Sequence, residues 1–564
     1  MDRLIECVPN ISEGRRDDVI QAIAATVETV DGVKLLDVDP GRSTNRTVIT
    51  FVGPPETIGE AAFRLIQKAA ELIDMSKHRG EHPRMGATDV CPFVPVRGVE
   101  MSECVAVAHA LGKRVGEELG IPGYFYENAA LRPERKNLAV CRKGQYEGLA
   151  KLTTEEGAPD FGPASWNDDV KQSGATGIGA RDFLIAYNIN LNTTSSRRAN
   201  AIAFDIRESG RVKREGGAGS AILKDGNGEP LREPGSLKAV KGIGWYIEEY
   251  GVAQLSLNLT DIQVTPVHIA FDEACLRAHA RGIRVTGSEL VGLLPLRVLT
   301  DAADFYLTKQ ERSLGISDAE KVKIAVKSLG LDDLTSFNPQ DRVIEYIIAE
   351  KGKTPLLEMD LEAFALETAS ESPAPGGGSI AAYAGALGAS LSTMVANLSA
   401  HKRGWDDRWK EFSDIAVRGM ALQGQLLGLV DADTAAFNGI MDAYGLPSGS
   451  EGQKRARIDA IQNATRHAID IPMEVARISL QSMEIAEKMA DFGNPNSITD
   501  AGVGAMAIRV GVMGAILNAR VNAKDLTDQR YVQETLRECD SMWSEVNSRE
   551  AAVLDRVAEI LRSE

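Results

Sequence analysis

The chain has little cysteine and no excess of positive charge. Its six cysteines are scattered over 564 residues, and none belongs to a Cys-x-x-Cys pair. Single cysteines of this kind indicate neither a disulfide framework nor a cysteine-ligated zinc site. The formal net charge of −17 argues against nucleic acid as a partner, because phosphate backbones are bound by clustered lysine and arginine.

The sequence also lacks the patterns of a leader and of a membrane anchor. Its start, MDRLIECVPNISEG, turns polar too early for a secretory signal peptide. No apolar run is long enough to span a bilayer, which requires roughly 20 residues. We therefore expect a cytoplasmic protein without a membrane partner. A length of 564 residues predicts about three or four domains.

Strand and helix patterns alternate in the first third of the chain. Four segments have the residue types of strands, namely 4–8, 33–38, 46–52 and 92–96. One helix is predicted after Ser12, which can cap it, and another spans 56–74. The resulting order, β-α-β-β-α-β, is that of a ferredoxin-like unit.

The same order of elements recurs further along the chain. Strands are predicted at 182–191, 237–249, 252–259 and within 284–295, and helices at 197–209 and 266–282. We therefore predict tandem α/β subdomains at 1–180 and 181–335. The glycine-rich segment 214–236 interrupts the second subdomain and is expected to be a surface excursion.

After about residue 336 the strand signals fade and long helical patterns take over. In 379–398, large apolar residues recur every three or four positions, with alanine, glycine and serine between them. Such small residues allow helices to approach closely. We predict a linker at 336–356 and an antiparallel, all-α helical bundle at 357–564.

One histidine pair has the spacing of a metal site. His78-x-x-Glu81-His82 matches the inverted zinc-protease pattern H-x-x-E-H. That motif needs a helix, whereas Gly80 and Pro83 favour a loop here. We therefore expect no metal.

Three loops of the first subdomain share one edge of a ferredoxin-like sheet, namely 9–12, 37–45 and 78–86. Asn10, Asp39 and His82 are thus predicted to converge, although a salt-bridged surface edge is an equal alternative. A carboxylate beside an imidazole fixes its tautomer and raises its basicity, which suits proton transfer near neutral pH.

Long motifs around these residues carry a family resemblance over essentially the whole chain. They include ECVPNISEGR, LLDVDPGRSTNRTVITFVG, HRGEHPRMGATDVCPFVPV, SGATGIGARDFLIAYNINL, KGIGWYIEE, TGSELVGLLP, SPAPGGGS and VDADTAAFNGIMDAYGLP. Together they resemble the formimidoyltransferase-cyclodeaminase family. The resemblance implies two α/β transferase subdomains followed by an all-helical cyclodeaminase domain. The segment 214–236 departs from the family, since some members lack it.

The resemblance implies a bifunctional folate enzyme of histidine degradation. Such an enzyme transfers the formimidoyl group from N-formimidoyl-L-glutamate to N5 of tetrahydrofolate and releases glutamate. It then converts 5-formimidoyltetrahydrofolate to 5,10-methenyltetrahydrofolate and ammonia. Tetrahydrofolate, with or without a polyglutamyl tail, is the implied co-substrate. The family also forms ring-like homo-oligomers built from dimers.

The resemblance assigns roles to individual residues. His82 matches the catalytic histidine of the transferase, with Asp39 expected to orient it. Asp433 matches the catalytic aspartate of the cyclodeaminase, and Asp431 stays open as the alternative. The family's folate-contacting loop matches 171–180, which otherwise reads as a flexible joint between subdomains. Its candidate binding residues are Ser173, Gly174, Ala175, Thr176, Gly177 and Gly179.

Anionic groups of the substrates need cationic or amide donors. Arg42, Arg46 and Arg84 lie in the loops of the predicted edge, with Asn10 beside them. Each arginine alone is more typical of a solvated charge, but their clustering favours a binding role for at least one. Glycine-rich backbone at a helix start suits an anion, here a folate carboxylate. This second candidate site consists of Gly376, Gly377 and Gly378.

Overall fold

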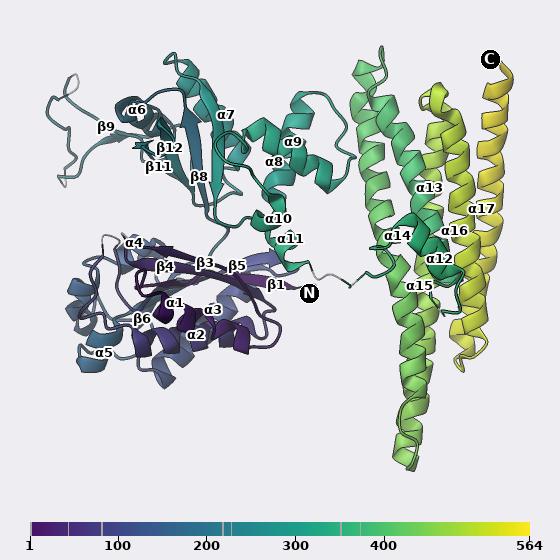
Figure 1. Cartoon of the computed structure of the whole chain (residues 1–564), viewed down its shortest axis with the longest axis horizontal. Helices are drawn as coiled ribbons and strands as arrows, with labels where there is room; N and C mark the ends of the chain where they lie inside the picture. Colours follow the sequence, from purple (N-terminus) through teal and green to yellow (C-terminus); the bar gives the residue numbers. More distant parts are fainter. Residues whose placement is uncertain are drawn as a thin grey trace. The chain divides into compact units, whose positions relative to one another are not determined.

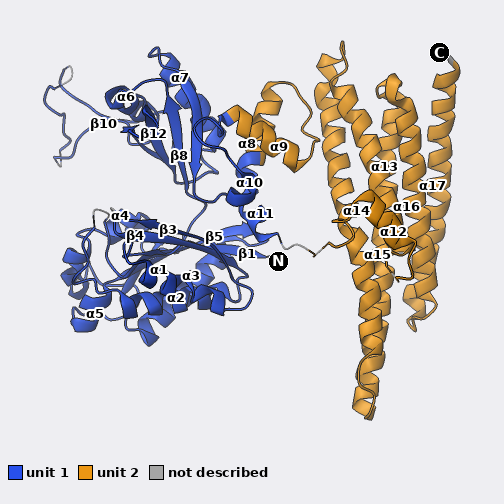
Figure 2. Cartoon of the chain, in the orientation of Figure 1, with its two compact units in different colours: residues 1–299, 329–349 blue, residues 300–328, 350–564 orange. Residues whose placement is uncertain are grey.

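The computed structural model describes residues 3–42, 44–80, 83–216, 219–226, 228–349, 352, 354–372 and 374–563. The chain divides into two compact units, which Figure 2 shows in different colours. Unit 1 comprises residues 1–299 and 329–349, and unit 2 comprises 300–328 and 350–564. Unit 1 mixes strands and helices, whereas unit 2 is helical throughout its described elements, so the predicted fold class is confirmed.

The first part of unit 1 is built on one sheet, seven-stranded over the described residues. Its strands are β1 (Leu4–Cys7), β2 (Asn10–Ile11), β3 (Lys34–Gly41), β4 (Arg46–Gly53), β5 (Thr88–Arg97), β6 (Gly123–Glu127) and β7 (Thr176–Ala180). β1 and β2 lie between β4 and β5 and pair antiparallel with both, and β3 lies beyond β4. This is the ferredoxin-like order. β7 and then β6 extend the sheet beyond β5 by parallel pairing.

Helices cover one face of this sheet. They are α1 (Asp17–Ala24), α2 (Ile58–Leu72) and α3 (Met101–Glu118). Ile5, Cys7, Phe51 and Phe93 point into the core that these helices close. The cap predicted at Ser12 is wrong. The residue before α1 is Arg16, which makes no side-chain cap.

The opposite face of the sheet is covered at its β6 end. The covering elements are α4 (Leu138–Cys141), a 3₁₀ helix at Tyr146–Thr153 and α5 (Asp168–Ser173). Val90, Tyr124 and Tyr126 form a smaller core with them. Side chains on a strand alternate between the two faces. At the β3–β4 end this second face carries Asp37 and Asp39 of β3, paired with Thr50 and Val48 of β4.

The second part of unit 1 repeats the plan with four antiparallel strands. Their order is β11 (Val240–Ile247), β12 (Val252–Leu259), β8 (Ile185–Leu191) and β13 (Val285–Val291). The accompanying helices are α6 (Ser196–Ile206) and α7 (Val267–His279). The repeated element order is therefore confirmed. The described residues of the segment 214–236 extend outward from this sheet (Figure 1), and β9 (Arg211–Val212) pairs with β10 (Arg232–Glu233) at its base.

Short helices follow the second sheet. They are α8 (Leu296–Lys309), α9 (Asp318–Leu329), α10 (Pro339–Arg342) and α11 (Ile344–Ile348). Residues 300–328 belong to unit 2, where the Leu314 N–H donates to the Ser413 hydroxyl at 3.0 Å.

Long helices lie side by side in the rest of unit 2 (Figure 1). After the short α12 (Leu361–Thr368) they are α13 (Gly377–Ala400), α14 (Trp409–Tyr444), α15 (Glu451–Phe492), α16 (Ile498–Ala523) and α17 (Gln529–Ser563). α13 and α14 run antiparallel, since Ser379 bonds to Val430 and Ser390 bonds to Gln423. The predicted helical bundle is therefore present.

α13 buries its small residues and exposes its large ones. Gly385, Gly388 and Ser392 are buried, whereas Leu387 and Met394 are 46% and 38% exposed. Because glycine and serine face the neighbouring helices, those backbones come close together. The large apolar side chains are consequently turned away from the core.

Two helical stretches, Gly377–Ala400 and Pro495–Ala523, are long and apolar enough to cross a membrane by length and composition. The expectation that no segment has that length is therefore wrong. In the most apolar 18-residue stretch of each helix, 61% and 50% of the residues, respectively, are buried within the protein. Core helices of a bundle show the same properties.

Gly388→Ala should destabilise the bundle. A methyl group there would lie 2.7 Å from the Gly504 carbonyl oxygen and from the Ile508 nitrogen, which are backbone atoms that cannot move independently. Overpacking of this kind costs about 1–3 kcal/mol. Gly424→Ala is the matched control, because its methyl meets nothing within 4 Å. The urea midpoint of the helical transition should fall for the first variant only, and equal midpoints would contradict the packing.

Candidate functional site

Three segments of unit 1 meet at one edge of the first sheet, as its predicted topology requires. The Ser12 hydroxyl donates to the Gly86 carbonyl at 2.7 Å. The Gly14 N–H donates to Asn45 Oδ1 at 3.0 Å, and Asn45 Nδ2 donates to the Arg79 carbonyl at 2.9 Å. The convergence of these loops is therefore confirmed for their described residues.

Asn45 is the residue at this edge that the sequence reading missed. It is buried, it connects the other two segments, and its φ of 50° lies in the left-handed region. Asparagine is among the few non-glycine residues that adopt this conformation readily. Its place in the turn-rich stretch DPGRSTN is the signal that could have identified it.

The loop after α2 holds His78 by both ring nitrogens. His78 Nε2 donates to the Asn45 carbonyl at 2.9 Å, and Nδ1 accepts from Arg84 Nε at 3.3 Å. This arrangement corresponds to a neutral ring, with neither nitrogen left for a metal. Glu81 and His82 lie outside the described residues. Within the described part of the chain, no group of three potential metal ligands occurs.

Asn10 and Asp39 lie in one row across the sheet, on the face opposite to α1–α3. Asp39 pairs with Val48, and Val48 pairs with Asn10. Asn10 is 4% exposed; its Nδ2 donates to the Val8 carbonyl at 2.8 Å, while its buried Oδ1 lacks a partner among the described residues. Asp39 is exposed. The predicted pair thus shares a face, with one carboxylate reachable from solvent.

The three predicted arginines have different surroundings. Arg84 is buried and donates twice to Glu147, at 2.8 and 2.9 Å, so its guanidinium is already paired. Arg42 is exposed and lies 3.6 Å from Asp17. Arg46 keeps a buried Nε without a partner in the described structure, and burial lowers the pKa of its guanidinium. Arg46 is therefore the candidate of the three for binding an anion.

A buried ion pair near Arg46 was also missed from the sequence. Asp89, only 1% exposed, accepts from Arg142 Nη2 at 2.5 Å and from the Met85 N–H at 2.9 Å. Burial raises the pKa of Asp89, and the Arg142 guanidinium opposes this rise. Arg142 lies more than 50 residues from Asp89 in the sequence, so no local pattern marks the pair.

The prediction of a loop over 171–180 is wrong. Ser173 ends α5, and residues 176–180 form the buried strand β7 between β5 and β6. A Cβ on Gly179 would lie 2.6 Å from the Tyr126 ring. Gly179 therefore makes room for an aromatic ring packed on the sheet. The alternative interpretation, a flexible joint between subdomains, does not describe the buried strand β7 either.

Gly174 and Ala175, at the start of the motif, contact the loop that follows α2. Gly174 has a φ of 70°, and it forms an isolated antiparallel bridge with Gly86. The Ala175 N–H donates to the Met85 carbonyl at 2.9 Å, and Thr176 Oγ1 is buried without a partner among the described residues. The motif is thus attached to the loop that ends at residue 86.

Two aspartates of α14 have different surroundings. Asp431 accepts the N–H groups of Leu356 and Leu357, at 2.9 and 3.3 Å, and so fixes the segment before α12. Asp433 instead faces the glycine-rich start of α13, where Ser379 Oγ lies 3.3 Å from its Oδ2. Burial raises the pKa of Asp433, and hydrogen bonds from Ser379 counteract this. A partly buried carboxyl group of this kind is suited to proton transfer.

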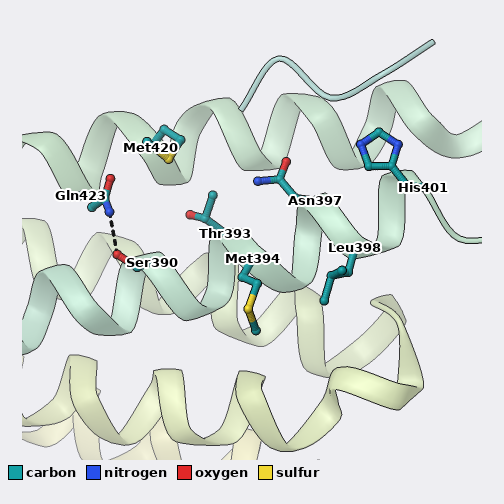
Figure 3. A pocket seen from close by; sticks show the side chains of 8 residues that line it. All are labelled: Ser390, Thr393, Met394, Asn397, Leu398, His401, Met420 and Gln423. Atoms are coloured by element: carbon teal, nitrogen blue, oxygen red, sulfur yellow. Dashed lines mark hydrogen bonds between the residues drawn. The ribbon is translucent and has the colours of Figure 1, made fainter. Parts of the chain in front are cut away.

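The groove between α13 and α14 also holds a cavity of about 270 Å³ (Figure 3). Ser390 of α13 and His401, which follows α13, line it together with Met420 and Gln423 of α14. Gln423 Nε2 donates to Ser390 Oγ at 2.7 Å. Ser390 follows Ser379 by about three helical turns, or roughly 16 Å. None of the predicted site residues lines this cavity.

Family models match three successive parts of the chain. The model described as "Formiminotransferase domain, N-terminal subdomain" matches residues 4–181, and "Formiminotransferase domain" matches 186–349. The model described as "Formiminotransferase-cyclodeaminase" matches residues 360–541.

Curated relatives match either the whole chain or part of it. A formimidoyltransferase-cyclodeaminase of Mus musculus is 43% identical over 556 residues, which is 98% of each chain. A glutamate formimidoyltransferase of Streptococcus pyogenes serotype M1 is 41% identical, covering 55% of this chain and 95% of that protein. A methenyltetrahydrofolate cyclohydrolase of Methylorubrum extorquens is 36% identical, covering 36% of this chain and 96% of that protein.

The His78 ring should remain neutral at a pH where an exposed histidine is half protonated. Burial, assisted by the Arg84 cation, lowers the pKa of His78, so its protonation requires a more acidic solution. NMR titration of the histidine rings should therefore show a midpoint below the usual value of about 6.5. Arg84→Met should move this midpoint upward by removing the cation. A midpoint at or above the usual value in the unchanged protein would contradict the described bonding.

Proposed function

Because the chain belongs to the formimidoyltransferase-cyclodeaminase family, we propose that unit 1 carries the transferase chemistry and unit 2 the cyclodeaminase chemistry. The expectation of a bifunctional enzyme is confirmed by this membership. Unit 1 transfers the formimidoyl group of N-formimidoyl-L-glutamate to N5 of tetrahydrofolate. Unit 2 closes the product to 5,10-methenyltetrahydrofolate. The observation that carries this division is the presence of two separate polar sites, one in each unit.

Transfer begins when N5 attacks the amidine carbon. N5 must then lose a proton and the departing glutamate nitrogen must gain one, which a single imidazole near neutral pH can accomplish. His82 is proposed for this role and Asp39 for orienting it. The bonds of Asn45 to the Arg79 carbonyl and to the His78 ring support the proposal, because they fix described residues that precede His82 in the chain. The unpaired donor of Arg46 supports a role in binding a substrate carboxylate.

Cyclisation begins when N10 attacks the formimidoyl carbon of the amidinium form. The proton of N10 passes to the ionised Asp433 carboxylate, and Asp433 then returns it to the amino group. The carbon–nitrogen bond breaks, ammonia leaves, and the methenyl cation remains. The partly buried position of Asp433 supports this role. Asp431 is a weaker candidate because backbone N–H groups already occupy both of its oxygens.

Tetrahydrofolate, including its polyglutamylated forms, is the proposed co-substrate, and histidine degradation is the proposed pathway. A cytoplasmic location is proposed as well. It is supported by six free cysteines, among them Cys7 and Cys91, whose sulfur atoms lie 3.5 Å apart without a disulfide bond. Thiols persist in a reducing compartment.

A homo-oligomer is the proposed assembly, with unit 2 supplying one interface. The large residues on α13 include Leu398, which is 45% exposed, and α16 exposes Val503, Met506 and Val510. The two helices adjoin at Leu391, whose Cβ lies 3.5 Å from the position of a Cβ on Gly504. An extended exposed apolar surface is typical of a protein interface. A second copy of this chain is the proposed partner.

The two activities should be separable by single substitutions. His82→Ala should stop formation of 5-formimidoyltetrahydrofolate but leave cyclisation of that compound, when supplied directly, near the unchanged rate. Asp433→Asn should do the reverse. Each affected step should slow by about 10²-fold or more, as expected for lost acid–base catalysis. Glutamate, ammonia and methenyltetrahydrofolate would be followed together, with thermal melts as the control. A well-folded His82→Ala variant that fails in both steps would refute the division.

The combined substitution of Met394→Glu and Met506→Glu should lower the molecular mass in solution. Two charges would be placed on the apolar surface that the second copy is proposed to cover, where desolvating them is unfavourable. Leu561→Glu is the matched control, since Leu561 is also about half exposed but lies on α17. Light scattering after gel filtration measures the outcome. An unchanged mass for the double variant would contradict this interface.

A further inference from the structure

In the first turn of α13, Ser379 directs hydrogen-bond donors at the Asp433 carboxylate. Ser379 is completely buried, and its backbone N–H as well as its hydroxyl interacts with Asp433. The hydroxyl shares its one proton between two acceptors, the Val430 carbonyl oxygen at 2.8 Å and Asp433 Oδ2 at 3.3 Å, and Thr434 Oγ1 also lies 3.3 Å away. Ser379 thus connects the start of one helix to the proposed catalytic turn of another.

Gly378 provides the space in which this carboxylate lies. A Cβ at Gly378 would lie 2.1 Å from Asp433 Oδ1 and 2.4 Å from its Cγ, much closer than atoms can approach. The obstructed group is the end of a side chain rather than backbone. An added methyl group would therefore displace the carboxylate while leaving both helices in place.

We propose that Ser379 and Gly378 are positioning residues for cyclisation, which together hold Asp433 in its reactive place. Ser379 donates hydrogen bonds to the Asp433 carboxylate, and Gly378, having no side chain, leaves the space that this carboxylate occupies. The inference rests on the proposed role of Asp433. It gives the glycine-rich motif a purpose within this chain, in addition to the folate-binding role expected from the sequence.

The physical reason lies in two opposing effects on Asp433. Burial favours the neutral carboxyl group, whereas a base must be ionised before it accepts the proton of N10. Donors aimed at the carboxylate favour the ionised form, and so does the positive end of the α13 dipole. Without them, the carboxyl group would remain protonated up to a higher pH.

The first test is the pH dependence of cyclisation in full-length Ser379→Ala, with 5-formimidoyltetrahydrofolate supplied directly. Loss of the hydroxyl should move the acidic limb of kcat upward by about 0.5–1 pH unit, in line with one modest hydrogen bond. Ser392→Ala is the matched control. Its hydroxyl is also buried on α13 but donates to the Gly388 carbonyl of its own helix. Equal acidic limbs in the two variants would overturn the role of Ser379.

The second test compares Gly378→Ala with Gly385→Ala. Both residues lie on α13, and a methyl group at Gly385 would also meet the end of a side chain, Ser479 Oγ, at 2.3 Å. Cyclisation should slow at least tenfold in Gly378→Ala relative to Gly385→Ala, with similar melting temperatures and unchanged transferase rates. Equal cyclisation rates would overturn the role of Gly378.

Asp433→Asn separates failure of this inference from failure of the proposed function. If Asp433→Asn cyclises normally, the assignment of the aspartate itself is wrong. If that variant is inactive while Ser379→Ala and Gly378→Ala behave as their controls do, the aspartate is catalytic but the start of α13 does not position it.

Discussion

Close approach between backbones is the constraint on which the helical unit depends. Where α13 meets α14, α15 and α16, its buried residues are glycine, alanine, serine and threonine, together with one valine, Val395. Larger residues there would force the helices apart. The same constraint turns Leu387 and Met394 outward, which leaves an apolar surface. It also brings Asp433 of α14 into the first turn of α13, because Gly378 has no side chain to exclude it.

Unit 1 depends on a different constraint, because loops at the edge of its first sheet must be held in place. The described residues of 9–14, 41–46 and 78–86 are distant in sequence. Asn45 restrains all three through its side chain and its carbonyl group. Arg84, paired with Glu147 and bonded to His78, fixes the third loop a second time. A positioned proton shuttle needs such restraint, since small displacements of reacting groups are costly.

The sequence motifs are informative about chemistry but ambiguous about conformation. SGATGIGA reads as a loop because glycine is rare in strands, yet it forms β7, where the missing side chains accommodate Tyr126. Ser12 reads as a helix cap, yet its hydroxyl bonds to Gly86. In both cases a tertiary contact decides the conformation against the local preference. Asp89 and Arg142 illustrate the limit further, since their pairing depends entirely on how the chain returns to the sheet.

The sequence by itself determined the ferredoxin-like order of elements in both subdomains, the change to helices and the family, but not the added strands β6 and β7. Those properties follow from periodicity and from long motifs, and both depend only on residues that are close together in the sequence. The tertiary structure alone decided that Asp433 rather than Asp431 faces the start of α13, that Arg84 is already paired, and that Asn45 connects the loops. These distinctions depend on which side chains become neighbours and how deeply they are buried, and a linear pattern does not specify either.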